Sequence, residues 1–191
     1  PSPFGSTSGF HPSSPSSTTQ QIAFVEFCCG PKSVLSAEAE GVGVEYLRIT
    51  KDSHDILTDA GIKRAEKDIR ALQDLGYQIR LWASLPCRPW SRYTDLNLSR
   101  LGPKYKERLY WQRLESFFAI QAFIKIAGPI LEKGGTVSFE WPAFCYGWKI
   151  PLLQSFFLEK GFKFVRVDGC AFGLSHRGKP VKKPWTIATT Q

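Results

Sequence analysis

The sequence lacks the residue patterns that build metal centres, disulfide frameworks and membrane spans. Its five cysteines are odd in number, contain no CxxC pair, and do not have the spacing of a disulfide framework. Its three histidines have no ligand spacing, so no metal site is predicted. No run of 18 apolar residues occurs, which argues against a membrane-spanning helix and a membrane partner. Unpaired cysteines are typical of a reducing compartment, so we expect an intracellular location, the nucleus or the cytoplasm.

Acidic residues are also scarce relative to basic ones. There are 17 acidic against 25 basic residues, a formal net charge of +8, which favours polyanionic partners. Residues 86–113 hold seven basic and two acidic residues, and residues 161–191 hold six basic residues and one acidic residue. Each segment therefore has a net charge of +5. Nucleic acid is the partner that these clusters favour, and a solvated basic face is the alternative.

The first 21 residues differ in composition from the rest. They contain seven Ser, four Pro and three Thr and carry no Asp, Glu, Lys or Arg. Such a segment buries too little apolar surface to offset its ordering entropy, so residues 1–21 are predicted to be a disordered tail or linker. Residues 22–191 form the predicted folded domain.

Strands and helices are expected to alternate through that domain. Apolar runs bounded by turn residues predict strands over 22–28, 44–49, 78–85, 136–139, 162–167 and 185–189. Apolar residues at helical spacing predict helices over 33–40, 59–75, 105–131 and 151–160, the third continuous or broken near Gly128. This order is typical of an α/β fold with a doubly wound, mostly parallel sheet covered on both faces. Ligands of such sheets bind at the carboxyl ends of the strands.

The first two predicted strand ends carry features of a nucleotide-type site. Residues 26–33 place Gly30 in a turn before a helix, where free N–H groups meet a ligand, although an ordinary turn explains the same residues. After the second strand, Asp52 is the first candidate to bind ribose hydroxyls and Asp55 the second. Capping of the following turn is the alternative role for both aspartates.

The third and fourth strand ends carry the candidate reactive groups. Cys87 lies between two prolines and is followed by Arg88 and Arg92, whose charge is expected to lower the thiol pKa. A half-buried packing cysteine is the alternative. Glu140 ends an apolar strand, where a carboxylate is costly unless it is ion-paired or functional. Beyond it, Lys182 and Lys183 lie beside an aromatic residue, a pattern that suits a nucleic-acid backbone and a stacked base, or a flexible loop.

In this order, five segments resemble motifs of the cytosine-C5 methyltransferase family. Residues 26–30 resemble the turn that holds S-adenosylmethionine, and 55–58 resemble a stretch beside its adenine. Residues 86–91 (Pro-Cys-Arg-Pro-Trp-Ser) resemble the loop that carries the nucleophile, and 139–142 resemble the motif of the catalytic glutamate. Residues 172–188 resemble the arginine-bearing C-terminal motif with an insertion. The chain is also similar to methyltransferase-like segments of algal retroelement polyproteins.

The resemblance implies a Rossmann-like sheet of the class I methyltransferase type and S-adenosylmethionine as cofactor. It implies methyl transfer to C5 of cytosine in DNA or RNA, with Cys87 as nucleophile, Glu140 as the group at ring N3, and Arg177 holding the base or its phosphate. Together with the strand-end aspartates, the motifs assign these cofactor-binding residues: Phe27, Cys28, Gly30, Asp52, Asp55, Leu57 and Pro86. The nucleic-acid-binding candidates are Arg88, Trp90, Arg92, Lys182 and Lys183.

The sequence departs from the family pattern at several positions. Lys32 replaces a glycine of the cofactor turn, Arg88 replaces a glutamine, and Trp141 replaces an asparagine. No residues remain for a target-recognition domain, so a protein partner is expected to supply target recognition. Two alternatives therefore stay open: a retired methyltransferase fold that acts as a nucleic-acid-binding or assembly module, and an enzyme that uses the same cysteine for another pyrimidine reaction.

Overall fold

A computed structural model describes residues 20–191. The prediction of a disordered tail over residues 1–21 falls almost wholly outside this range. Six strands form one sheet in the order β2-β1-β3-β4-β8-β5. Their bounds are Ile22–Phe27 (β1), Glu45–Ile49 (β2), Gln78–Ala83 (β3), Thr136–Pro142 (β4), Lys163–Asp168 (β5) and Pro184–Thr189 (β8). All neighbouring pairs are parallel except those of β8, which is antiparallel to β4 and β5. The predicted α/β fold with a mostly parallel sheet is confirmed.

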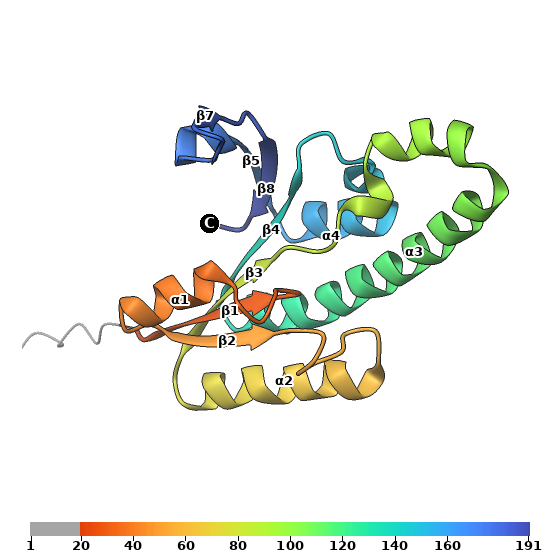
Figure 1. The fold of residues 1–191 in the computed structure, drawn as a ribbon. Helices are drawn as coiled ribbons and strands as arrows, with labels where there is room; N and C mark the ends of the chain where they lie inside the picture. Colours follow the sequence, from red (N-terminus) through yellow and green to blue (C-terminus); the bar gives the residue numbers. More distant parts are fainter. Residues whose placement is uncertain (1–19) are drawn as a thin grey trace, which may run out of the picture.

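Four helices connect these strands. They are α1 (Val34–Gly41), α2 (Asp59–Asp74), α3 (Tyr93–Glu132) and α4 (Pro151–Glu159). The chain moves from β1 to β2 in one direction along the sheet, and from β2 through β3 to β4 in the other. Because parallel crossovers are right-handed, α1 lies on one face and α2, α3 and α4 lie on the opposite face. Figure 1 shows α1 above β1 and β2, with α2 below them.

The reversal of strand order creates a switch point between β1 and β3. The chain leaves β1 for β2 on one side, and returns past β1 to β3 on the other. Loops that follow β1 and β3 therefore diverge at the carboxyl edge of the sheet, and leave room for a ligand there. The cofactor-type motifs and the cysteine loop lie at this edge.

The hydrophobic core fills the space between the sheet and α3. Phe123 of α3 is completely buried and packs its ring against Phe27 of β1, Phe139 of β4 and Phe156 of α4. In β4 the buried side chains alternate with half-buried ones, so Val137, Phe139 and Trp141 face the helices. The side chains between them, including Glu140, therefore face the other side of the sheet.

Helix α3 starts earlier than the sequence predicts. Residues 86–104 are rich in Arg, Trp and Tyr and are interpreted as a loop, but the helix already begins at Tyr93. A kink at Gly102, where φ is 67°, splits off the first part of the helix before Pro103. Glycine allows this left-handed conformation, and proline starts the longer segment without needing its missing N–H group. The alternative break near Gly128 does not occur, because the helix continues through Pro129.

A small hairpin between β5 and β8 is not predicted from the sequence. Strands β6 (Ser175–His176) and β7 (Lys179–Pro180) pair antiparallel around Arg177 and Gly178. Both turn residues have positive φ, 51° and 73°, which is the geometry of a tight type I′ hairpin turn. Each strand has two residues, too few for an alternating pattern to appear in the sequence.

Among the described residues, α3 alone is long and apolar enough, by length and composition, to cross a membrane. Its residues Ile120, Phe123 and Ile126 are buried in the core of the domain. A core helix passes the same test of length and composition, so the test gives only weak evidence for a membrane span.

Candidate functional site

Two cavities lie on opposite sides of the loop that carries Cys87. The first cavity has a volume of about 300 Å³ and lies at the switch point. Its wall comes from the ends of β1 and β2, the loop before α2, the loop after β3, and the middle of α3. The residues that line it include Cys28, Thr50, Asp55, Ile56, Leu57, Pro86, Arg88, Gln112, Glu115 and Ala119.

A buried hydrogen-bond network fixes the loop that follows β2. His54 is 5% exposed, and its Nδ1 and Nε2 atoms lie 2.8 Å from the Ser53 hydroxyl and 2.9 Å from the Asp68 carboxylate of α2. Gly61 in the first turn of α2 lets the loop pass close, since a Cβ there would lie 2.1 Å from the Asp55 carbonyl oxygen. The loop thereby presents Asp55 and Leu57 to the first cavity.

The structure brings four of the seven cofactor-binding candidates into the wall of the first cavity: Cys28, Asp55, Leu57 and Pro86. Three others lie elsewhere. Phe27 is fully buried in the core, Gly30 lies in the exposed turn after β1, and Asp52 is exposed at the tip of its loop. Asp52, the first choice for a ribose contact, is therefore less well placed than Asp55. The Asp55 carboxylate accepts a hydrogen bond from the Leu57 N–H group at 3.1 Å, which closes the turn before α2, whereas the N-cap of α2 is Thr58.

Lys32 does not block the first cavity. Its side chain is exposed, and it is absent from the cavity wall. A Cβ added to Gly30 would meet no heavy atom within 4 Å, so space beside this turn is open as well. The departure from the family pattern at Lys32 thus leaves room for a ligand at the end of β1.

The second cavity contains Cys87. Its volume is about 640 Å³, and it lies between the cysteine loop, the start of α3, the loop after β4 and the segment that precedes β8. Arg92, Lys182 and Lys183, three of the nucleic-acid-binding candidates, line it together with Cys87. No carboxylate of residues 20–191 belongs to its wall. The cavity therefore presents a thiol in positively charged surroundings.

Glu140 lies beside this thiol. It is half-buried on β4, and its Oε1 accepts a hydrogen bond of 3.0 Å from the hydroxyl of Ser84, three residues before Cys87. The negative charge of Glu140 acts on Cys87, raising the pKa of the thiol. Cys87 and Glu140, which follow or end neighbouring strands, are thus close together. This agrees with the expectation that functional residues gather at the carboxyl ends of the strands.

The pKa of Cys87 moves in the direction opposite to the sequence-based expectation. Burial raises it above the ordinary value, because a half-buried thiolate loses hydration. Lys183 partly opposes this effect, whereas Arg88 and Arg92 do not contribute. Arg88 lines the first cavity, and the guanidinium of Arg92 lies 5.7 Å from the centre of the Phe144 ring. The prediction that these two arginines lower the thiol pKa is therefore wrong.

The raised pKa predicts a distinctive alkylation profile for Cys87. Since the thiolate is the reactive form, its reaction with iodoacetamide should still accelerate as the pH rises past the ordinary thiol value of 9.0. Lys183→Gln removes a nearby cation, raises the pKa further and should slow alkylation at pH 8 by roughly 2- to 5-fold. The rates can be read by mass spectrometry of the Cys87 peptide. Lys179→Gln, which removes an exposed charge from β7, should leave the rate unchanged, and an equal effect of both variants would refute the assignment.

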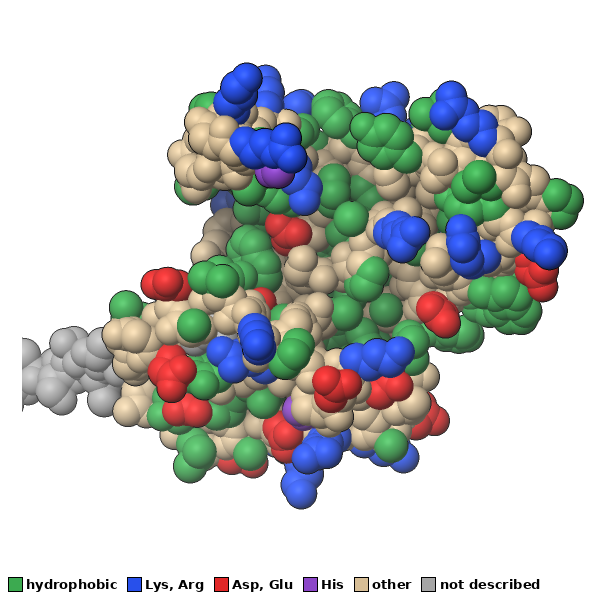
Figure 2. All heavy atoms as spheres, in the orientation of Figure 1, with side chains coloured by type: hydrophobic (Ala, Val, Ile, Leu, Met, Phe, Trp, Pro, Cys, Tyr) green, Lys and Arg blue, Asp and Glu red, His purple; other side chains and the backbone are tan. Residues whose placement is uncertain are grey.

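Three further candidate residues, Arg177, Trp90 and Arg88, lie away from the Cys87 thiol. Arg177 is exposed at the tip of the β6–β7 hairpin and belongs to neither cavity wall. Trp90 packs against α3, where its indole N–H donates to the Ser116 hydroxyl at 2.7 Å. Arg88 faces the switch point on the opposite side of the loop from Cys87. Figure 2 shows Lys and Arg side chains on both sides of the recess between the hairpin and the start of α3.

Sequence reasoning missed several residues of the site. Cys145 is a second thiol in the cavity of Cys87, and burial raises its pKa to about 11. Phe144 lines the same cavity, and Glu115 of α3 lines the first one. Cys145 and Phe144 could have been found from the sequence, because both follow the carboxyl end of β4 by only a few residues, where ligands of such sheets bind. Glu115 lies in mid-helix, where no local pattern indicates a ligand site.

Comparisons with protein families, with curated proteins and with solved structures found no match to this chain. The residues of the site and their geometry therefore carry the functional argument.

Proposed function

We propose that this domain is an S-adenosylmethionine-dependent methyltransferase that transfers a methyl group to C5 of cytosine in nucleic acid. One observation carries the proposal: the loop Pro86–Arg88 separates two cavities, with Pro86 and Arg88 in the wall of one and Cys87 in the wall of the other. A transfer reaction needs a donor and an acceptor on either side of the reacting group. This loop lies at the switch point of the sheet and separates a cavity for the donor from a cavity for the acceptor.

The residues of the first cavity fit the proposed cofactor. Its volume of about 300 Å³ lies at the lower end of the range for small-molecule sites. Ile49, Ile56 and Leu57 offer apolar surface for a purine ring. Asp55 and Glu115 offer carboxylates for hydroxyl groups and for the positive charges of the methionine part. When bound, S-adenosylmethionine supplies an electrophilic methyl group and leaves as S-adenosylhomocysteine.

Cys87 and Lys183 in the wall of the second cavity, together with Glu140 beside the thiol, fit activation of the base. The Cys87 thiolate adds to C6 of cytosine, forming an S–C6 bond and making C5 nucleophilic. Glu140 as an acid donates a hydrogen bond to N3 and stabilises the charge that develops on the ring. After C5 takes the methyl group, its proton leaves to solvent, the S–C6 bond breaks, and the C5–C6 double bond re-forms. Lys183 assists by favouring the thiolate.

The remaining parts of the proposal concern the fold type and the target. The reversed strand β8 between β4 and β5 supports a sheet of the class I methyltransferase type. Arg92, Lys182 and Lys183 favour a polyanionic target, and Arg177, which is exposed on the hairpin, would contact a phosphate rather than the base. A protein partner would add target recognition, and the cytosine of a duplex would have to flip out to reach Cys87.

A second candidate function is nucleic-acid binding without methyl transfer. The raised pKa of Cys87 favours it, because the free protein holds the thiol mostly in its unreactive form at neutral pH. The basic wall of the second cavity binds phosphates equally well without chemistry. Under this hypothesis, affinity for nucleic acid depends on salt but is unaffected by S-adenosylmethionine.

Calorimetric titration with S-adenosylmethionine separates the two candidates. We expect micromolar binding, and Asp55→Asn should weaken it about 10-fold by removing a carboxylate that accepts hydrogen bonds from the ligand. Asparagine retains the oxygen that accepts from the Leu57 N–H group, so the loop should stay folded. Asp52→Asn is the matched control, because Asp52 is exposed and lies outside the cavity wall.

Equal loss of affinity in both variants would refute the role of Asp55. The absence of heat at millimolar ligand, with a folded protein, would refute methyl transfer by this chain and leave the binding module as its function.

A further inference from the structure

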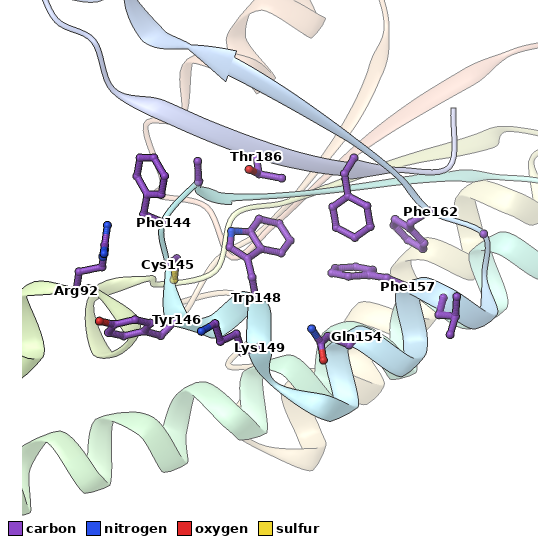
Figure 3. Close-up of a pocket in the computed structure, with 14 residues that line it drawn as sticks. Arg92, Phe144, Cys145, Tyr146, Trp148, Lys149, Gln154, Phe157, Phe162 and Thr186 are labelled. Atoms are coloured by element: carbon purple, nitrogen blue, oxygen red, sulfur yellow. The ribbon is translucent and has the colours of Figure 1, made fainter.

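A long aromatic groove continues from the cavity of Cys87. It has a volume of about 1090 Å³ and runs between the loop after β4, the middle and end of α4, and the last two strands of the sheet, β8 and β5. It shares Arg92, Phe144 and Cys145 with the Cys87 cavity, so the two spaces adjoin. In Figure 3, Arg92 and Phe144 stand at one end, Trp148 lies in the middle, and Phe157 and Phe162 lie at the other end.

The open end of this groove combines exposed aromatic surface with unpaired positive charge. Phe144 is 52% exposed, and the guanidinium groups of Arg92 and Arg166 lie 5.7 and 5.0 Å from its ring centre. Lys149 is a third exposed cation; it lines the groove together with Arg92, whereas Arg166 borders the groove through its contact with Phe144. Within residues 20–191, none of these three cations forms an ion pair with a carboxylate, and no carboxylate lines the groove. Positive charges gathered around one ring repel each other, so an anion placed among them lowers the free energy.

We propose that this groove binds a single-stranded nucleic acid that runs past the cavity of Cys87. Phosphates would lie at Arg92, Lys149 and Arg166, and bases would stack on Phe144 and on the arginine planes. A groove that tracks the backbone with basic residues and offers aromatic faces is the design of single-strand sites. The inference rests on the proposed function only in directing one base of the strand into the cavity of Cys87.

The shape and charge of the groove favour this occupant over a small molecule or a protein. Its volume exceeds the usual upper limit of about 1,000 Å³ for small-molecule sites. Asp95 accepts a hydrogen bond from the hydroxyl of Tyr146 at 2.9 Å but, within residues 20–191, forms no ion pair with Arg92, Lys149 or Arg166. A purely apolar peptide would leave the charges of Arg92 and Arg166 unmatched.

Fluorescence anisotropy of labelled 12-nucleotide DNA and RNA single strands, and of the matched duplex, tests the proposal on the whole chain. We expect at least one single strand to bind more tightly than the duplex at equal salt. Phe144→Ala should weaken this binding by roughly 5-fold or more, the lower end of what one stacked base contributes. Arg166→Gln should weaken it and reduce the slope of log affinity against log salt by about one.

Matched controls remove the same groups outside the groove. Tyr110→Ala deletes an aromatic ring that is 62% exposed on α3, and Arg70→Gln removes an exposed charge from α2. Both should change affinity by less than 2-fold. Circular dichroism checks that every variant is folded. If Phe144→Ala binds as tightly as the parent, or the duplex binds as tightly as both single strands, the groove is not a single-strand site. A dimer that oligonucleotides do not dissociate, and that Phe144→Ala converts to monomer, would assign the groove to a second copy and overturn the proposal.

The outcome is independent of methyl transfer. Strand binding that depends on Phe144, in a protein that does not bind S-adenosylmethionine, would keep the groove and refute the proposed function. Binding of S-adenosylmethionine with no effect of Phe144→Ala on strand affinity would keep the proposed function and refute the groove as a strand site.

Discussion

Cys87→Ala should abolish methyl transfer and leave the fold and the affinity for S-adenosylmethionine nearly intact. In the proposed mechanism Cys87 makes the bond to C6 on which all later steps depend, so the rate should fall below roughly 10⁻³ of the starting value. The first cavity, where we propose that the cofactor binds, should be unaffected, because Cys87 lines the other cavity. The measurement is transfer of a labelled methyl group to cytosine in an oligonucleotide, alongside calorimetry.

An oligonucleotide that carries 5-fluorocytosine gives a second readout. Fluorine at C5 cannot leave as a proton does, so the S–C6 bond should persist as a covalent adduct that Cys87→Ala cannot form. Cys170→Ala is the matched thiol control, because Cys170 lies in neither cavity wall and should retain full activity. Glu140→Gln should retain the adduct-forming thiol but slow transfer about 100-fold. Turnover that survives Cys87→Ala would show that the thiol is not the nucleophile.

The strands at the centre of the sheet could be predicted from the sequence because each carries apolar residues that become buried. The runs beginning at Ile22, Gln78 and Thr136 each end in turn residues, and their predicted starts agree with the structure. Helix α3 was harder to predict. Its first turns carry the exposed Tyr93 and Leu96 and so lack a buried stripe, and the kink at Gly102 interrupts the period. The local pattern therefore predicted the long packed segment of α3, which also borders the first cavity, and missed residues 93–104, which border the cavity of Cys87.

The candidate site, like α3, could be predicted from the sequence only in part. The strand-end rule correctly indicated Cys87 and Glu140 as neighbours, because the ends of adjacent parallel strands meet at one edge. It could not show which way a loop side chain points: Asp52 and Asp55 differ by three positions, yet only Asp55 reaches the first cavity. Nor could it show the pKa direction of Cys87, which depends on burial rather than on neighbouring sequence charges.

Trp141→Ala should cause the largest loss of stability among single substitutions near the site, about 3–5 kcal/mol in the free energy of unfolding. The side chain is fully buried, and its ring packs edge-to-face against Phe139 and Trp148. A Cβ added to Gly147 would lie 2.1 Å from the indole ring, so the cavity left by alanine faces a backbone with no side chain to fill it. Urea unfolding measures the loss. Trp111→Ala, at a tryptophan that is 56% exposed on α3, should cost less than about 1 kcal/mol.

Trp141→Phe then separates packing from positioning of the cysteine loop. The indole N–H of Trp141 donates to the Leu85 carbonyl at 2.7 Å, one residue before Pro86. Phenylalanine keeps most of the apolar contact but leaves this carbonyl without its buried donor, at a cost of about 1–3 kcal/mol. If the bond positions Cys87, kcat for methyl transfer should fall while the Kd for S-adenosylmethionine stays constant. A loss of stability with kcat unchanged would show that Trp141 supports the fold alone. The tryptophan that departs from the family pattern would then have no part in presenting the nucleophile.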